Sequence, residues 1–306
     1  MPLAAQFSEY GTTDELTVVE VPDKSPGPGQ VRLAVRAAGV NPIDWKLLSG
    51  AMRAQMLLQL PAGLGSDVAG VVDQLGEGVS TWQVGDEVLG SSASPAFAQS
   101  AVADAGALVA KPAGLPWEVA GGIAGAGATA WTVIDDLALA AGETLLIHAA
   151  AGGVGTMAAQ VALARGARVI GTAGPDKHEL LRSLGVEPVT YGEGLADRVR
   201  ALSPAGVDAV LDASGRGEIP VSIELAGGPE RVLTLVAFDQ AASGVRIHVG
   251  GGGADSAPAV AGIVGLIQEG RLRVPVARTF PLADVAAALE LSRAGHVAGK
   301  LVVLPV

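Results

Sequence analysis

The residues of this 306-residue chain best suited to chemistry form the glycine-rich run AAGGVG (150–155). The run follows an apolar stretch (145–150) and opens a helical pattern (153–165), which is the context that a dinucleotide-binding loop requires. Gly152 would let the backbone approach a pyrophosphate, and Gly155 would let the helix pack closely against the strand. The alternative is a tight strand-to-helix turn without a ligand. The residues expected to contact a cofactor here are Ala151, Gly152, Gly153, Val154 and Gly155.

The next apolar strand, RVIGTA (168–173), indicates which dinucleotide would bind. NAD sites usually place Asp or Glu about 20 residues beyond the loop, where it binds the ribose 2′-hydroxyl. Residues 168–175 contain no Asp or Glu, and the first acid after the strand is Asp176. No carboxylate in the strand would therefore repel a 2′-phosphate. Lys177 could attract that phosphate, and Tyr191 could add a hydroxyl. The pattern therefore predicts NADP(H), with Thr172 and Gly174 also in the site, unless Lys177 is only a solvated first-turn residue.

Two segments with different secondary-structure patterns must position these residues. Residues 1–115 are rich in turn signals, and 30–40 alternates apolar with polar or small residues, which predicts short antiparallel strands in a barrel-like domain. From about 119 to 252, apolar strands alternate with helical segments, which predicts a parallel sheet with both faces covered. The buried strands expected there are 145–150, 168–173, 209–214 and 231–237, and the expected edge strand is 245–250.

The composition excludes several classes of function. The formal net charge is −11 and no basic face is visible, so no nucleic-acid partner is expected. Without cysteine, disulfides and thiolate–zinc sites are excluded, and the four histidines lack metal-ligand spacing. Neither a membrane span nor a signal peptide is apparent, so a cytoplasmic protein is expected.

Several segments together resemble a known family. HAAAGGVG (148–155) and GTAG (171–174) resemble the zinc-independent quinone oxidoreductases of the medium-chain dehydrogenase/reductase superfamily, including the zeta-crystallin type. Further segments agree in order, namely AAGVNPIDWKLLSG (37–50), GSDVAGVVDQLGEGVSTWQVGDEVLG (65–90), GATAW (127–131) and GHVAGKLVVLP (295–305). The resemblance implies an α/β protein. A GroES-like β-barrel catalytic domain would comprise 1–115 together with 271–306, and a Rossmann doubly wound parallel sheet would comprise 116–270.

The chain departs from zinc-dependent relatives of that family at their ligands. Those relatives place a cysteine where Asn41 stands and His-Glu where Ser66-Asp67 stands. Zinc polarises the carbonyl in alcohol oxidation. The resemblance therefore implies zinc-free reduction of an activated small-molecule acceptor, a quinone or an α,β-unsaturated carbonyl, by NADPH.

Negative charge developing on the acceptor oxygen would need a donor, and Asn41 and Lys46 are the candidates. Many quinone reductases carry tyrosine where Lys46 stands, and lysine resembles the enone-reducing branch; Lys46 could equally be a surface charge. Asp44 would orient the segment. Beyond the glycine-rich loop, the cofactor contacts expected from the resemblance and from the carboxyl edge of the sheet are Thr129, Ser214, Val236, Ala237 and Phe238.

Other readings of the sequence remain. GHVAGK (295–300) lacks Walker spacing, and His148 is expected to be a core histidine. A non-catalytic NADPH-binding protein and an enoyl-thioester reductase are the alternatives to a quinone or enone reductase. Alternating apolar and polar residues in 245–250 predict a homodimer formed by pairing of this edge strand.

Overall fold

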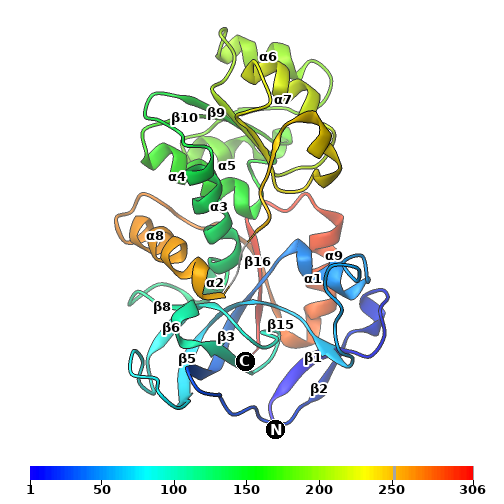
Figure 1. Ribbon diagram of the computed structural model, residues 1–306, viewed down its shortest axis with the longest axis vertical. Coiled ribbons are helices and arrows are strands. Elements are labelled where there is room, and N and C mark those ends of the chain that lie inside the picture. Colours follow the sequence, from blue (N-terminus) through cyan, green and yellow to red (C-terminus); the bar gives the residue numbers. More distant parts are fainter. Residues whose placement is uncertain (251–252, 306) are drawn as a thin grey trace. The chain divides into compact units, whose positions relative to one another are not determined.

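The computed structural model describes residues 1–250 and 253–305, and the chain divides into two compact units (Figure 1). Unit 1 comprises Met1–Ala128, Gly252–Val264 and Val274–Val306; unit 2 comprises Thr129–Gly251 and Gly265–Arg273. The first division falls at 128/129, beyond the expected 115/116. The reason is that the first turn of helix α3 (Ala124–Asp136) belongs to unit 1, where Gly125 N–H donates to the Asp67 carboxylate at 3.0 Å. Helix α8 (Ala257–Gln268) is likewise divided, at 264/265.

Strand β3 (Gln30–Val40) organises unit 1. Its bounds match the prediction, because Val31, Leu33 and Val35 alternate into the core. It pairs antiparallel with β5 (Asp67–Leu75) and with the strands β7 and β16. The sheet has the order β15-β16-β3-β5-β6-β8, with β7 beside β3. The other elements of this unit are β1 (Leu3–Phe7), β2 (Thr17–Glu20), α1 (Pro42–Leu48), β4 (Ala62–Gly63), β6 (Glu87–Ser91), β7 (Ser100–Asp104), β8 (Leu108–Ala110), α2 (Trp117–Gly121), β15 (Val276–Pro281), α9 (Val285–Ala294) and β16 (Lys300–Leu304).

One strand pair of unit 1, formed by residues beyond the predicted antiparallel segment 1–115, is parallel. The pair consists of β15 and β16. Helix α9 joins them, and a parallel pair needs such a crossover, whereas a tight turn joins antiparallel strands. Strand β16 then pairs antiparallel with β3, so the chain end returns to the sheet of the first domain, as the family resemblance implies.

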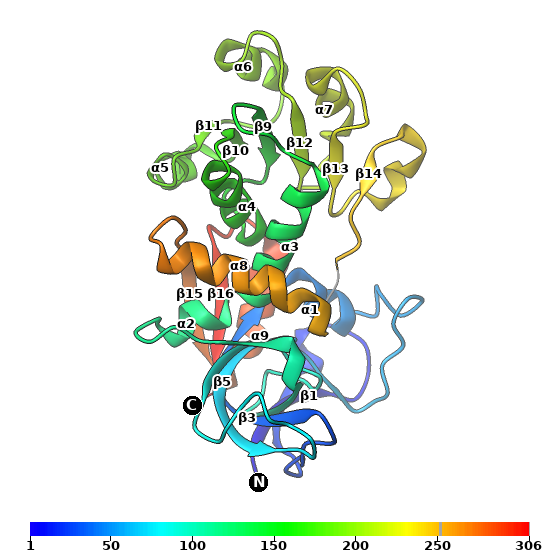
Figure 2. The same ribbon diagram turned by 60° about the vertical axis from the view of Figure 1, so that its left-hand side comes forward.

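Unit 2 is built on six parallel strands in the order β11-β10-β9-β12-β13-β14, flanked by helices (Figure 2). In order of sequence these are strands 3-2-1-4-5-6, the arrangement of a Rossmann sheet. The predicted α/β fold, a GroES-like domain with a doubly wound parallel sheet, is therefore confirmed. The elements are β9 (Thr144–His148), α4 (Gly153–Ala164), β10 (Arg168–Thr172), α5 (His178–Ser183), β11 (Glu187–Val189), α6 (Leu195–Leu202), β12 (Ala209–Asp212), α7 (Ile219–Ala226), β13 (Val232–Thr234) and β14 (Arg246–Ile247).

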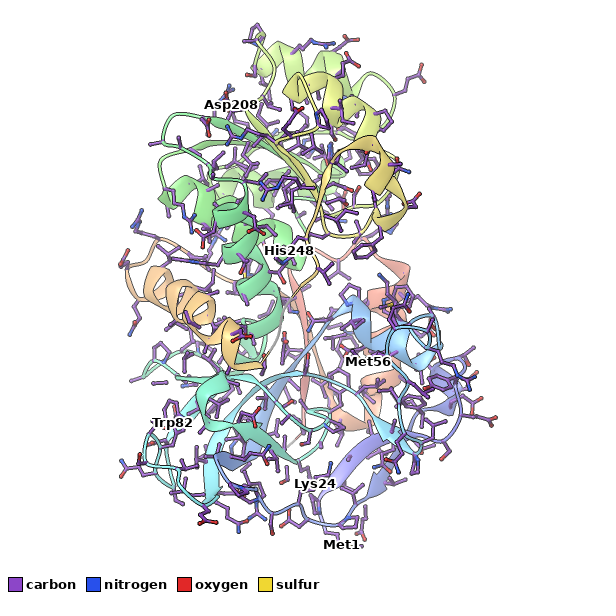
Figure 3. The ribbon with its side chains drawn as sticks, in the orientation of Figure 1. Met1, Lys24, Met56, Trp82, Asp208 and His248 are labelled. Carbon is purple, nitrogen blue, oxygen red and sulfur yellow. The ribbon has the colours of Figure 1, made fainter. Side chains whose placement is uncertain are left out.

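The predicted edge strand lies at the edge of this sheet, but it is shorter than the predicted 245–250. Strand β14 has two residues, although His248 N–H extends the pairing by donating to Thr234 at 3.0 Å. The imidazole of His248, labelled in Figure 3, lies 2.9 Å from an Asp136 carboxylate oxygen. Val249, which follows the paired residues, is 77% exposed, so burial of its side chain contributes little to extending the strand. Residues 251 and 252 lie outside the described residues.

Membrane-spanning helices are absent from the described ranges, since none of their helices combines the required length with the required hydropathy.

Candidate functional site

The glycine-rich loop of unit 2 connects β9 to α4. Ala149 adopts a positive φ of 56°, and Gly152 N–H closes a turn on the Ala149 carbonyl at 3.0 Å. Helix α4 begins at Gly153, so the N–H groups of its first turn lack intrahelical acceptors and can bind an anion. This geometry fits a pyrophosphate at the loop.

The two glycines of the loop are required to different degrees. A Cβ on Gly155 would lie 2.5 Å from the Ala149 carbonyl oxygen and 2.8 Å from the Ala150 Cα, which the backbone could not accommodate. A Cβ on Gly152 would meet only the Ala149 oxygen, at 3.3 Å, and the φ of −74° suits any residue. Packing of α4 on the strand therefore needs Gly155, while Gly152 is free of that constraint.

A buried polar network lies under the loop. His148 is completely buried, with Nε2 2.9 Å from the Ser222 hydroxyl. Burial lowers the pKa of His148, against the opposing charges of Asp212 and Glu218. The Thr172 hydroxyl accepts a hydrogen bond from Ala149 N–H at 3.2 Å, so its side chain is engaged within the sheet. His148 is thus placed as a core histidine.

The turn that follows β10 brings the carboxylate of Asp176 beside Gly174. Asp176, in the 3-10 turn Pro175–Lys177, folds back so that Oδ1 would lie 2.6 Å from a Cβ on Gly174. Lys177 is half-buried in the same turn, and Tyr191 is 39% exposed beyond β11. An acid and a cation therefore stand close to the position that selects between a ribose hydroxyl and a 2′-phosphate.

Asp212 joins the loops that follow β12 and β13. Oδ1 of its carboxylate, which is 1% exposed, accepts from Ser214 N–H at 2.9 Å and from Gly215 N–H at 3.1 Å. This Asp212 oxygen also lies 2.9 Å from the Ser214 hydroxyl, whose single proton is shared with Glu218 at 2.6 Å. The other oxygen accepts from the Thr234 hydroxyl at 2.9 Å. Thr234 Oγ1 in turn accepts from Ala237 N–H at 2.9 Å. One buried carboxylate thus holds both loops, although Asp212 is not among the site residues predicted from the sequence.

The remaining candidate cofactor residues of unit 2 differ in exposure. Thr129 and Val236 are half-buried, Ala237 is buried, and Phe238 is 52% exposed. A cavity of about 440 Å³ opens where the chain leaves β11 and β12. Its lining consists of Tyr191, Gly192, Gly194, Leu195, Ala196, Arg216, Gly217, Glu218 and Val221. The cavity lies beyond the carboxyl ends of the strands, where open α/β sheets bind ligands.

A second buried network of polar side chains lies in unit 1, around the ammonium of Lys300. Lys300 is 4% exposed, and its Nζ donates to the Asn41 Oδ1 at 2.6 Å and to the Val40 carbonyl at 3.0 Å. The nearer oxygen of Asp67, Oδ2, is 3.8 Å away. We call Asn41, Asp44, Asp67 and Lys300 the buried cluster. Asn41 is one of the predicted site residues, whereas Lys300 is known from the sequence only as the end of the segment 295–300, which lacks Walker spacing.

The two acids of the buried cluster are held by backbone groups. Asp44 accepts from Asn41 N–H at 2.8 Å and from Gly65 N–H at 3.2 Å, so it orients the Asn41 segment as expected. Burial raises the pKa of Asp44 to about 7, and the neighbouring charge of Asp67 adds to the shift. Asp67 Oδ2 is buried without a hydrogen-bond partner, so the ammonium of Lys300 is its main compensation.

Stability should depend on pH through Asp44. The folded protein retains a proton on Asp44 up to about pH 7, whereas the unfolded chain releases it near its ordinary value of 3.8. Stability is therefore lost as pH rises between these values, by up to about 4 kcal/mol for a shift of this size. Urea unfolding of the unmutated protein and of Asp44→Asn at pH 4, 5.5 and 7 should show the unmutated protein losing stability relative to the variant. Parallel curves for the two proteins would contradict this.

Lys46 is placed apart from the buried cluster. It lies on α1, is half-buried, and holds its Nζ 5.6 Å from the centre of the Trp45 ring. Within the described residues no hydrogen bond joins it to Asn41. Its role as a donor stays a prediction.

The donor set of the buried cluster does not fit a zinc ion. Zinc in proteins prefers thiolate, imidazole and carboxylate ligands in a tetrahedral arrangement. Here Asn41 presents its amide oxygen to an ammonium, Ser66 is exposed, and the charge on Lys300 would repel a cation. Nowhere in the described part of the chain do three histidine, aspartate or glutamate residues gather as a metal site.

Comparison with known proteins identifies the family. A family model described as "Alcohol dehydrogenase GroES-like domain" matches residues 27–139, and one described as "Zinc-binding dehydrogenase" matches 184–303. A quinone oxidoreductase of Pseudomonas aeruginosa is 34% identical over 98% of this chain and 98% of its own length. The chain belongs to the quinone oxidoreductases of the medium-chain dehydrogenase/reductase superfamily. The predicted resemblance is thus confirmed, and this family member is an oxidoreductase.

The chain is also similar to part of a much larger protein. A mycocerosic acid synthase-like polyketide synthase of Mycobacterium tuberculosis is 33% identical over 90% of this chain, which covers 14% of the synthase.

Among solved structures, the quinone oxidoreductase of Coxiella burnetii has a TM-score of 0.87 at 30% identity, with 99% of both chains covered. A mycobacterial protein solved with NADPH has a TM-score of 0.88 at 30% identity over the full length of both chains. The CurK enoyl reductase has a TM-score of 0.86 at 27% identity, with 99% of both chains covered.

Proposed function

We propose that this oxidoreductase uses NADPH to reduce a quinone or an α,β-unsaturated carbonyl compound without zinc. The observation that carries the proposal is the buried cluster, where an amide and an ammonium replace a metal-binding donor set. A fixed N–H donor can stabilise negative charge on the oxygen of an already activated acceptor, whereas oxidation of an alcohol would lack the Lewis acid that polarises its oxygen.

Each group of residues has a part in this proposal. The chemistry that NADPH supplies when bound is hydride transfer from its nicotinamide ring. The loop 151–155 would bind the pyrophosphate, and Lys177 with Tyr191 would bind the 2′-phosphate. Asn41 would donate to the acceptor oxygen, and Lys46 is the second candidate donor. Further cofactor contacts are proposed for Thr129, Thr172, Gly174, Ser214, Val236, Ala237 and Phe238.

Cofactor choice is expected to depend on Lys177 and on its neighbour Asp176. NADPH should bind more tightly than NADH, and Lys177→Ala should weaken NADPH binding by roughly ten- to 100-fold while leaving NADH binding nearly unchanged, since one charge-assisted contact is worth about 1.5–3 kcal/mol. Asp176→Ala is the matched control. Because it removes a negative charge beside Gly174, it should raise the affinity for NADPH. Fluorescence titrations give these constants. Equal dissociation constants for the two cofactors in the unmutated protein would exclude the NADP assignment.

Turnover separates the enzyme from a non-catalytic NADPH-binding protein. NADPH oxidation should be followed with a panel of quinones, enones and enoyl thioesters, before and after exhaustive dialysis against EDTA. We expect turnover with at least one quinone or enone, and an unchanged rate after chelation. If NADPH binds but none of the tested acceptors supports its oxidation, the non-catalytic alternative is correct. If activity is lost on chelation and restored by zinc, the zinc-free proposal is wrong.

An enoyl-thioester reductase is the second candidate. It is favoured by the similarity to polyketide synthases and to the CurK enoyl reductase. Turnover that is at least ten-fold more efficient with enoyl thioesters than with simple enones of the same chain length would establish this candidate.

We also propose that the protein is a homodimer paired through β14. The position of this strand at the sheet edge supports the proposal, because unpaired edge strands tend to be covered or paired. Sedimentation equilibrium at micromolar concentration should give twice the mass of one chain. The mass of a single chain would exclude the dimer.

A further inference from the structure

The amide of Asn41 faces a partner that allows only one orientation. A lysine ammonium has three donors and no acceptor, and an asparagine amide has one acceptor end and one donor end. Lys300 Nζ is 2.6 Å from the Asn41 side chain, so the atom that faces it must be the carbonyl oxygen Oδ1. The donor end, Nδ2, is left for another partner, and no described residue accepts a hydrogen bond from it.

The ammonium is itself held in place from several sides. Lys300 is the first residue of β16, and the next residue, Leu301, pairs with Val40 of β3. Its Nζ also donates to the Val40 carbonyl at 3.0 Å and lies 3.8 Å from Asp67 Oδ2. The Asp67 carboxylate is fixed in turn, because its other oxygen accepts from Gly125 N–H at 3.0 Å. Lys300 therefore cannot move away from Asn41 without leaving Asp67 Oδ2, a buried carboxylate oxygen with no hydrogen-bond partner, uncompensated.

The backbone of Asn41 is fixed as well. Its N–H donates to the Asp44 carboxylate at 2.8 Å, and its carbonyl accepts from Asp44 N–H at 3.0 Å. With the backbone N–H, the carbonyl and Oδ1 all occupied, Nδ2 is the one polar atom of Asn41 that remains available. A positive charge on the oxygen side also draws electron density from the amide, which makes its N–H a stronger donor.

We infer that Lys300 is a positioning residue for the reaction, which holds the Asn41 amide with its NH2 group directed to the acceptor oxygen. This inference rests on the proposed function. It assigns Lys300 no contact with substrate or cofactor: Lys300 acts through Asn41. Zinc-dependent relatives use the charge of a metal ion at the acceptor oxygen. Here the positive charge is that of the Lys300 ammonium, which orients and polarises the neutral amide of Asn41.

A double-mutant cycle tests the inference with the full-length protein. We expect Asn41→Ala to lower kcat by roughly 100-fold, in the range found for the loss of one oxyanion donor. Lys300→Met should lower kcat by at least ten-fold, and the double variant should be no slower than Asn41→Ala alone, because Lys300 acts only through Asn41. The dissociation constant for NADPH should stay within about three-fold in all of them, and Lys300→Arg should recover part of the kcat. Effects on kcat that multiply would show that Lys300 acts independently of Asn41 and would overturn the inference.

A matched control addresses loss of stability alone. Lys111 is also a buried lysine of unit 1, paired with Glu87 at 2.7 Å and outside the buried cluster. Lys111→Met should lower Tm but leave kcat unchanged. A similar fall of kcat in Lys111→Met and Lys300→Met would mean that any buried lysine of this unit has the same effect, which would overturn the inference.

A second variant keeps the inference testable if Lys300→Met does not fold. Asn41→Asp preserves an oxygen for the Lys300 ammonium but replaces the donor Nδ2 with a second acceptor. It should keep a Tm no lower than that of Asn41→Ala while losing at least as much kcat. Retained kcat in Asn41→Asp would overturn the inference. Failure of the unmutated protein to turn over any acceptor is a different result, since it would overturn the proposed function itself.

Discussion

Asp212→Ala is expected to weaken NADPH binding by at least ten-fold and to lower the free energy of unfolding by about 3 kcal/mol, the range for leaving buried donors without their charged acceptor. The carboxylate accepts three hydrogen bonds, from Ser214 N–H, Gly215 N–H and the Thr234 hydroxyl, and it lies 2.9 Å from the Ser214 hydroxyl, which also contacts Glu218. Without it, the loops after β12 and β13 lose their common anchor. Both loops carry residues proposed to contact the cofactor, so affinity and stability should fall together.

Isothermal titration with NADPH and urea unfolding measure the two effects. Asp239→Ala is the control, because Asp239 is an exposed carboxylate of the same unit whose described side-chain hydrogen bond is to the neighbouring Gln240. It should change neither quantity by more than the error of the measurement. If Asp212→Ala loses stability but retains full NADPH affinity, the two loops do not contribute to the cofactor site.

The two loop glycines should separate affinity from stability. Gly155→Ala would place a Cβ 2.5 Å from the Ala149 oxygen, so α4 must shift away from β9, which should lower the free energy of unfolding by about 1–3 kcal/mol and abolish most NADPH binding. Gly152→Ala meets the same oxygen only at 3.3 Å. It should be folded and nearly as stable as the unmutated protein, yet bind NADPH at least ten-fold more weakly if the pyrophosphate approaches the backbone there.

Thermal unfolding with and without NADPH distinguishes the two glycine variants in one experiment. Gly155→Ala should have a lower Tm in the absence of the cofactor, and Gly152→Ala should instead lose the rise in Tm that NADPH produces. A normal NADPH-induced rise in Gly152→Ala would mean that the cofactor does not contact this glycine closely.

The local sequence pattern determined those strands and helices in which buried apolar residues recur with a regular spacing. The alternation in β3 predicted its bounds, because each side chain of a half-buried strand reports on one face of the sheet. The apolar run, the glycines and the helical pattern around the loop predicted β9 and α4 within a few residues. The absence of cysteine excluded thiolate ligands without any structure.

Strand ends and pairing partners were less accessible from the sequence. Strands β13 and β14 are shorter than their apolar runs, because residues beyond the paired segment pack in loops instead of the sheet. The side chain of Asp176 folds back onto Gly174, so a carboxylate stands near the end of β10 although the strand itself contains none.

The catalytic candidates depended most on the tertiary structure. Asn41 could be named from its segment, but Lys300 lies 259 residues away and comes beside it only because β16 pairs with β3. Asp212 likewise acquires its role from Thr234 and Ser214, which meet it where two parallel strands end side by side. The sequence determined which residue types were available and which were absent; strand pairing decided which of them are buried together, and burial is what makes their hydrogen bonds strong enough to fix an orientation.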